Sequence, residues 1–94
     1  MLSRIPILIE KLKREDCDKE IVRAAMIAEL DAIDLHEQMA VLAKDERIKK
    51  VLLEVAREEK THTGGFQALL LRLDGEHEKE LEAGKKEVEE LIPR

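Results

Sequence analysis

Three side chains of metal-binding types lie at positions where helical periodicity places apolar residues. Glu29 lies in the apolar stripe of one predicted helix, and Glu59 and His62, spaced as Glu-x-x-His, lie in the stripe of the next. Residues three apart on a helix project to the same side, so Glu59 and His62 can bind one metal ion together. A carboxylate that faces a helix–helix seam is costly unless a partner neutralises its charge. One carboxylate helix and one Glu-x-x-His helix make up half of the ligand set of a di-iron carboxylate bundle.

A second copy of the chain would complete this ligand set. Two-fold pairing gives four carboxylates and two imidazoles, and two divalent ions would balance the four negative charges. Oxygen-rich ligand sets with a few imidazoles suit iron or manganese better than copper. We therefore predict an iron site shared between two chains, where manganese or other divalent ions can also bind.

Each signal alone has an ordinary structural explanation. A single Glu in a helix seam usually lies at the edge of the stripe and extends to water, and Glu-x-x-His arises often by chance. The combination of Glu29 with Glu59 and His62, on adjacent antiparallel helices, favours the metal site.

Further polar residues near the stripes have less certain roles. His36, seven residues after Glu29, is an extra ligand, a donor that orients a carboxylate, or a histidine near the bundle end. We favour the last two roles over direct ligation. Asp31 and Glu58 lie beside the stripe and either guide iron inward or form a solvated acidic face, which is the commoner explanation. His77 is predicted to lie at the surface.

The apolar pattern predicts two long helices and a shorter one. A short helix or arm is expected over residues 1–18. Asp16 or Asp18 is expected to cap the first long helix, and Asp45 the second. Helices are predicted over residues 19–44, 46–73 and 76–92. The first stripe is Val22, Ala25, Met26, Glu29, Ala32, Ile33, His36, Met39, Ala40 and Ala43, and the second is Ile48, Val51, Leu52, Val55, Glu59, His62, Phe66, Leu69, Leu70 and Leu73. Gly64 and Gly65 interrupt the second stripe, where another backbone can approach closely.

The predicted fold is all-α, with residues 1–94 forming a single domain. The connection between the two long helices is too short for anything but an antiparallel hairpin. Such a hairpin exposes an apolar face, so we predict that a homodimer completes a four-helix bundle. Aromatic residues make up 1% of the chain, which suits narrow helix seams better than a sandwich or barrel core.

Composition excludes several classes of function. The net charge of −5, with no basic patch, argues against nucleic-acid binding. Cys17 is the only cysteine, so an intrachain disulfide and a Cys-rich metal site are excluded. No apolar run reaches the length of a membrane span, and residues 1–9 lack the features of a signal peptide. We expect a soluble cytoplasmic protein.

Two segments resemble the encapsulated ferritins, a family of the ferritin-like, rubrerythrin-related group. Residues 24–38, with the sequence AAMIAELDAIDLHEQ, resemble the first long helix of that family. Residues 56–62, AREEKTH, resemble its Glu-Glu-Lys-x-His motif on the second helix. With residues 66–74, the resemblance covers most of residues 19–92.

The resemblance implies that Glu29, Glu59 and His62 are ferroxidase ligands, donated by both chains at a dimer interface. It also implies a decameric ring of five dimers that oxidises Fe(II) and delivers the product into an encapsulin shell, so that the protein lies inside an encapsulin nanocompartment. Asp31 matches one acidic position of the family's metal-uptake site, whereas Ala28 stands at the partner position. No shell-targeting peptide is visible at the C-terminal end, and some archaeal relatives are fused to the shell protein instead.

Three functions are consistent with these observations. The favoured one is a di-iron ferroxidase that uses O2 or peroxide. The first alternative is a metal-free helical module that only dimerises. The second is a rubrerythrin-like di-iron peroxidase, which is disfavoured because Cys17 alone cannot form the four-thiolate iron site of that group.

Overall fold

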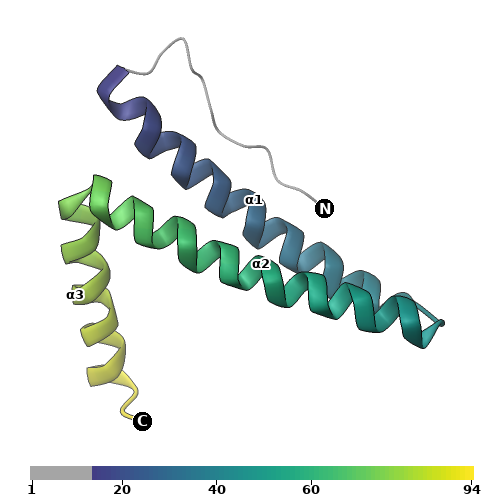
Figure 1. Ribbon diagram of the computed structural model, residues 1–94. Coiled ribbons are helices and arrows are strands. Elements are labelled where there is room, and N and C mark those ends of the chain that lie inside the picture. The colour runs from purple at the N-terminus through teal and green to yellow at the C-terminus, as the bar shows by residue number, and fades with distance from the viewer. Residues whose placement is uncertain (1–13) are drawn as a thin grey trace.

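The computed structural model describes residues 14–94 and contains three α-helices and no β-strand in that range. Helix α1 is Arg14–Leu42, α2 is Glu46–Leu73 and α3 is Gly75–Leu91. Helices α1 and α2 lie side by side as an antiparallel hairpin, and α3 turns away from the end of α2 (Figure 1). The predicted all-α class and the hairpin are confirmed. None of the described helices combines the length and the apolar character that a membrane span needs.

The turn between the two long helices has the predicted cap. The Asp45 carboxylate accepts a hydrogen bond from the backbone N–H of Arg47 at 2.8 Å, in the first turn of α2. Glu46 adds a negative charge at the positive end of the helix dipole. Residues 43–45 are all that separates the two helices, so the chain reverses tightly and α2 packs along α1.

The start of α1 differs from the prediction. The helix begins at Arg14 and runs through Asp16 and Asp18, which were predicted to end the arm and to cap a helix from residue 19. Asp costs less than about 0.7 kcal/mol relative to Ala inside a helix, and acidic residues near an N-terminus favour the helix dipole. With no Gly or Pro in α1, nothing ends the helix there. The rest of the predicted arm lies outside the described residues.

The core of the hairpin is a thin line of mostly small side chains. Within residues 17–94, the buried apolar residues are Ala24, Ile33 and Ala40 of α1 and Ala56 and Leu70 of α2. Ile33, Ala40 and Leu70 belong to the predicted stripes, whereas Ala24 and Ala56 do not. Alanine has little side chain to separate the helices, so the two backbones approach each other closely along this line.

A second apolar surface of the hairpin stays exposed. Large apolar residues of the predicted second stripe keep about half or more of their surface accessible: Ile48 is 55% exposed, Val51 62%, Leu69 50% and Leu73 51%. Leu30, Met39, Val41 and Leu42 of α1 are exposed as well. Apolar surface of this extent is typical of an interaction site.

Asp74 connects all three helices. One oxygen, Oδ1, accepts the backbone N–H of His77 at 3.0 Å and so caps α3, and the other accepts Arg23 Nη2 of α1 at 2.7 Å. The hydrogen bond from His77 holds the pKa of the Asp74 carboxyl below its usual value, and the positive charges of Lys19 and Arg23 act in the same direction. Asp74 therefore ends α2, as predicted, and fixes where α3 begins.

We expect Asp74→Ala to lower the melting temperature and Asp74→Asn to recover most of the loss, because an amide oxygen also caps a helix. The lowered pKa of Asp74 means that its stabilisation is present above the usual Asp pKa, about 3.9, and is lost as the pH falls through the folded value. Thermal unfolding followed by circular dichroism at neutral and strongly acidic pH measures both effects. Identical melting of the wild type and Asp74→Ala at neutral pH would contradict the proposed role of the junction.

Candidate metal centre

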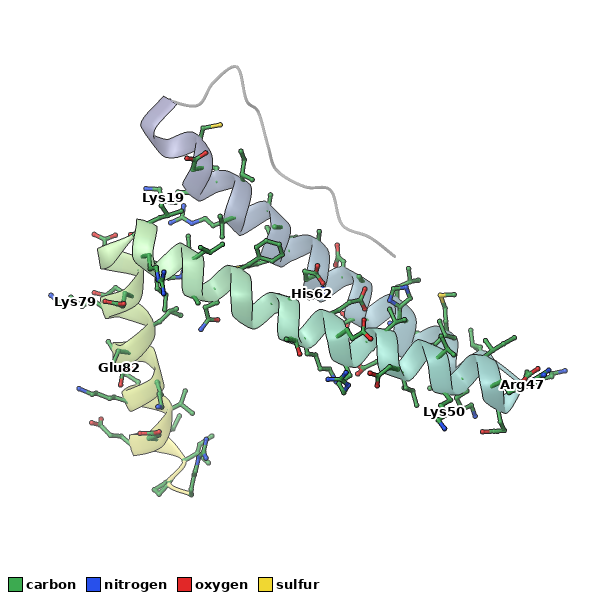
Figure 2. All side chains as sticks on the ribbon, viewed as in Figure 1. Lys19, Arg47, Lys50, His62, Lys79 and Glu82 are labelled. Carbon is green, nitrogen blue, oxygen red and sulfur yellow. The ribbon has the colours of Figure 1, made fainter. Side chains whose placement is uncertain are left out.

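Two histidine–carboxylate pairs bridge α1 and α2 in the middle of the hairpin. Glu29 Oε1 of α1 lies 3.4 Å from His62 Nδ1 of α2. One to two turns away, His36 Nδ1 of α1 lies 2.8 Å from Glu59 Oε1 of α2. Figure 2 shows His62 midway along the hairpin, far from α3. The antiparallel packing thus brings together four residues that the sequence analysis singled out.

The carboxylates are the sheltered members of these pairs. The Glu29 side chain is 21% exposed and that of Glu59 13%, compared with 55% for His62. The second oxygen of Glu29, Oε2, is buried and has no hydrogen-bond partner among the described residues. A buried carboxylate oxygen without a donor is costly, and a cation is the partner that best relieves that cost. The residues present therefore fit a bound metal ion.

A shallow apolar hollow lies beside the Glu29–His62 pair. It is lined by these two residues together with Gly65, Phe66 and Leu69. Helix α2 continues through Gly64 and Gly65, in agreement with the single helix predicted over residues 46–73. A Cβ atom at either glycine would meet nothing within 4 Å. Close approach of another backbone at this point stays a prediction, and the open space beside the glycines leaves room for it.

The described part of one chain supplies two histidine–carboxylate pairs, which are fewer ligands than a di-iron site needs. Within residues 14–94, no three His, Cys, Asp or Glu side chains come together in a group that holds a metal ion. The usual di-iron site needs four carboxylates and two imidazoles. A di-iron site would therefore need ligands from a second chain.

His36 contacts Glu59 directly, a pairing that the sequence analysis did not assign. Of the roles considered for His36, this contact bears on the donor that orients a carboxylate, which stays a prediction. The sequence signal for His36 was its spacing of seven residues from Glu29. Its contact with Glu59 depends on the register between α1 and α2, which the spacing of residues along one helix does not define.

The remaining predicted residues belong to neither of the two pairs. Glu58 is exposed and Asp31 is half-buried, and their role in guiding iron stays a prediction. His77, predicted at the surface, is half-buried at the start of α3, where its backbone N–H donates to Asp74 Oδ1 at 3.0 Å. Cys17 is a partly buried free thiol near the start of α1.

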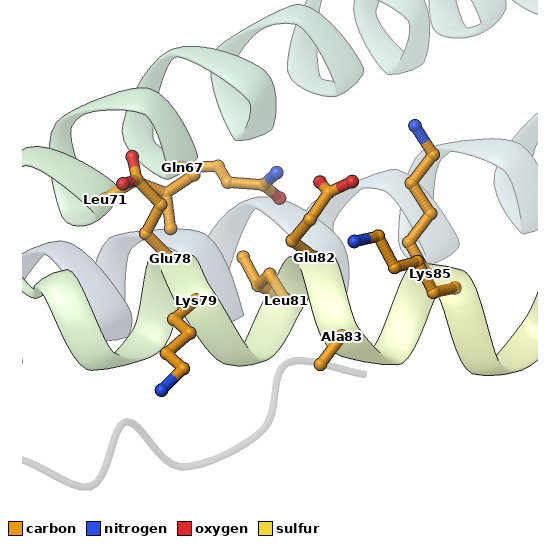
Figure 3. A pocket seen from close by; sticks show the side chains of 9 residues that line it. Gln67, Leu71, Glu78, Lys79, Leu81, Glu82, Ala83 and Lys85 are labelled. Carbon is orange, nitrogen blue, oxygen red and sulfur yellow. The ribbon is translucent and has the colours of Figure 1, made fainter.

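A larger hollow between α2 and α3 has a different character. Its lining includes Gln67 and Leu71 of α2 and Glu78 and Glu82 of α3, with lysine side chains nearby (Figure 3). The lining residues include carboxylates and ammonium groups but no imidazole. These opposite charges compensate one another, so this hollow has no requirement for a metal ion.

The fold and the paired residues define a ferritin-like helical protein. The family model described as EncFtn-like matches residues 6–88, and the chain belongs to that family, the encapsulated ferritins. The resemblance inferred from residues 24–38 and 56–62 is therefore confirmed.

Two relatives from Pyrococcus furiosus are similar to the chain. It is 55% identical over 93 residues to a ferritin-like–encapsulin shell fusion protein, an alignment that covers 97% of this chain and 27% of that protein. The chain thus spans about a quarter of the fusion protein's length. The crystal structure of the encapsulated ferritin domain from the same organism matches with a TM-score of 0.83 and 52% identity, over 100% of this chain and 98% of that one.

Proposed function

We propose that two copies of this chain form a ferroxidase that oxidises Fe(II) to Fe(III) at a shared di-iron site. The observation that carries the proposal is the buried, unpartnered Oε2 of Glu29, whose other oxygen lies 3.4 Å from the Glu-x-x-His histidine His62. Membership of the encapsulated ferritin family supports an iron-related role. Each Fe(II) gives up one electron, and O2 or peroxide is the acceptor.

In this proposal each chain contributes Glu29, Glu59 and His62 to the substrate iron. The 3.4 Å contact between His62 and Glu29 is longer than a normal hydrogen bond, and the His62 side chain is more than half exposed. His62 is therefore free to leave Glu29 and bind iron. The two Glu29 and two Glu59 carboxylates carry four negative charges, which balance the charge of two Fe(II) ions.

The exposed apolar surface of the hairpin supports pairing. Ile48, Val51, Leu69 and Leu73 would be covered by the partner's hairpin in a four-helix bundle. Helix α3 contains no buried residue and exposes Leu81, Val88 and Leu91. We assign α3 to contacts between dimers, which would give the decameric ring that the family resemblance implies.

The product iron is proposed to pass into an encapsulin compartment. A hairpin pair encloses no storage space of its own, so mineral must accumulate elsewhere. The fusion of a similar chain to an encapsulin shell in P. furiosus supports a location inside such a shell. We propose the shell protein as the partner, whether fused to this chain or separate.

Specific activity is expected to fall when the protein is diluted below the dissociation constant of the dimer, because the separated chains carry too few ligands. Aerobic Fe(II) oxidation followed by absorbance, with chain association measured by analytical ultracentrifugation, tests this. Constant activity per chain in a sample shown to be monomeric would refute the shared site.

A matched pair of variants sharpens the dilution experiment. Val51→Glu places a charge on the exposed apolar surface without touching a proposed ligand, and it should move the loss of activity to higher protein concentration. Lys50→Glu introduces the same residue at the neighbouring exposed position and should leave the concentration dependence close to that of the wild type.

A further inference from the structure

The two histidine–carboxylate pairs differ in length and in shelter. His36 and Glu59 are 2.8 Å apart, and their side chains are 25% and 13% exposed. His62 and Glu29 are 3.4 Å apart, and His62 is 55% exposed. Normal N–H···O hydrogen bonds measure about 2.7–3.2 Å, so the first pair forms a hydrogen bond and the second does not.

From this contrast we propose that His36 is a positioning residue that holds the Glu59 carboxylate from the opposite helix. The inference rests on the proposed function, in which Glu59 binds iron. A metal-bound carboxylate is ionised and only accepts hydrogen bonds, so the proposal requires His36 to donate from Nδ1. The same nitrogen then has no lone pair for a metal. His36 therefore acts on iron through Glu59 and does not bind it through Nδ1.

The bond crosses between helices, which makes it more than a local contact. His36 lies on α1 and Glu59 on α2, and the next residues along both helices also pair, with Lys60 Nζ 2.8 Å from Glu37 Oε2. The Glu37–Lys60 pair is exposed on both sides and contributes little. The sheltered His36–Glu59 bond is the one that fixes the Glu59 side chain in the seam before iron arrives.

Hydrogen bonds to metal-binding side chains have measurable effects. Removing such a partner typically lowers metal affinity by about 10–100-fold. A loss of this size is expected when His36 is replaced by leucine, which keeps apolar volume and removes both ring nitrogens. The free carboxylate would then sample orientations that do not face the iron.

Two further variants separate positioning from ligation. Asparagine places its amide nitrogen at the same number of bonds from Cα as Nδ1, so His36→Asn should restore donation to Glu59. Glutamine places its terminal group nearer to the position of Nε2, so His36→Gln would restore a ligand but not the Nδ1 contact. His77→Leu is the control histidine substitution, because His77 lies at the start of α3 and belongs to neither histidine–carboxylate pair.

The measurement is anaerobic calorimetric titration of the metal-free protein with Mn(II) at one fixed chain concentration, with the Mn(II) paramagnetic resonance spectrum recorded for each variant. We expect His36→Leu to lose about 10–100-fold in affinity, His36→Asn to regain most of it and to show a wild-type spectrum, and His77→Leu to match the wild type. Rescue by His36→Gln but not by His36→Asn would overturn the proposal in favour of direct ligation. Unchanged affinity in His36→Leu would overturn it as well.

A further test uses only the wild-type protein, so its outcome does not depend on whether a variant folds. Long-range proton–nitrogen correlation spectra of the metal-free protein should show His36 Nδ1 protonated, and an unprotonated Nδ1 would contradict the proposed donor. Failure of the proposed function is distinguishable from failure of this inference. If the wild-type protein binds no Mn(II), the metal site is refuted, whereas the protonation state of His36 is measured independently of any metal.

Discussion

Glu29→Ala is expected to lower the rate of Fe(II) oxidation by at least about 100-fold. The substitution removes one carboxylate from each chain, hence two from each shared site, and even residues that only support metal ligands are worth about 10–100-fold. Absorbance at a wavelength where Fe(III) species absorb measures the initial rate under air. Asp34→Ala removes the same charge from an exposed position of α1 and should retain wild-type activity.

The Glu29→Ala variant also distinguishes the ferroxidase hypothesis from that of a metal-free dimerisation module. In the absence of metal, Glu29→Ala is expected to raise the melting temperature whether the protein is a ferroxidase or a dimerisation module. The reason is that an uncompensated buried carboxylate destabilises the helix seam. Only a metal site predicts that Glu29→Ala also loses the stabilisation by metal ions. Wild-type oxidation rates in Glu29→Ala would eliminate the ferroxidase proposal.

Metal ions are expected to drive assembly. Pairing of two metal-free chains brings four carboxylates into one apolar seam, where like charges repel or take up protons. Two divalent ions remove this repulsion and cross-link the chains, and ligand at 100 times its dissociation constant stabilises the bound state by about 2.7 kcal/mol. Size-exclusion chromatography with light scattering should therefore give a smaller mass for chelator-treated protein than for Fe(II)- or Mn(II)-loaded protein, with a lower melting temperature.

The expected increase in mass should fade in acid, because protons compete with metal for imidazole and carboxylate ligands. His62→Ala provides the control, since it keeps the apolar surface of the hairpin but removes a proposed ligand. Equal masses with and without metal would mean that apolar packing alone determines the assembly, and the electrostatic argument would be wrong.

Local signals predicted the helices well where a strong cap or stop exists. Asp45 caps α2 and Asp74 ends it, and the predicted range of residues 46–73 agrees with the structure. The start of α1 was missed because Asp16 and Asp18 favour caps but tolerate a helix interior at small cost. The N-terminal boundary therefore depended on a weak preference, which the helix dipole and the absence of Gly and Pro outweighed.

The site was predictable in its residue types but not in its pairings. Glu29, Glu59 and His62 stand out because polar groups in an apolar stripe need a reason. The buried residues Ala24 and Ala56 gave no such signal, because alanine is common on every helix face. The contact between His36 and Glu59 depends on how α1 and α2 are aligned, and that alignment is set by the three-residue turn and by the close packing at those alanines.

The shared di-iron site is tested most directly by native mass spectrometry of the protein titrated anaerobically with Fe(II). We predict that single chains carry no bound iron and that pairs of chains carry two ions, with His62→Ala as the control for adventitious adducts. Because the ligands of one chain form only pairs, occupancy should appear together with the dimer and at no lower assembly state. Iron bound to single wild-type chains, at a level above that of His62→Ala, would contradict a site that two chains must build together.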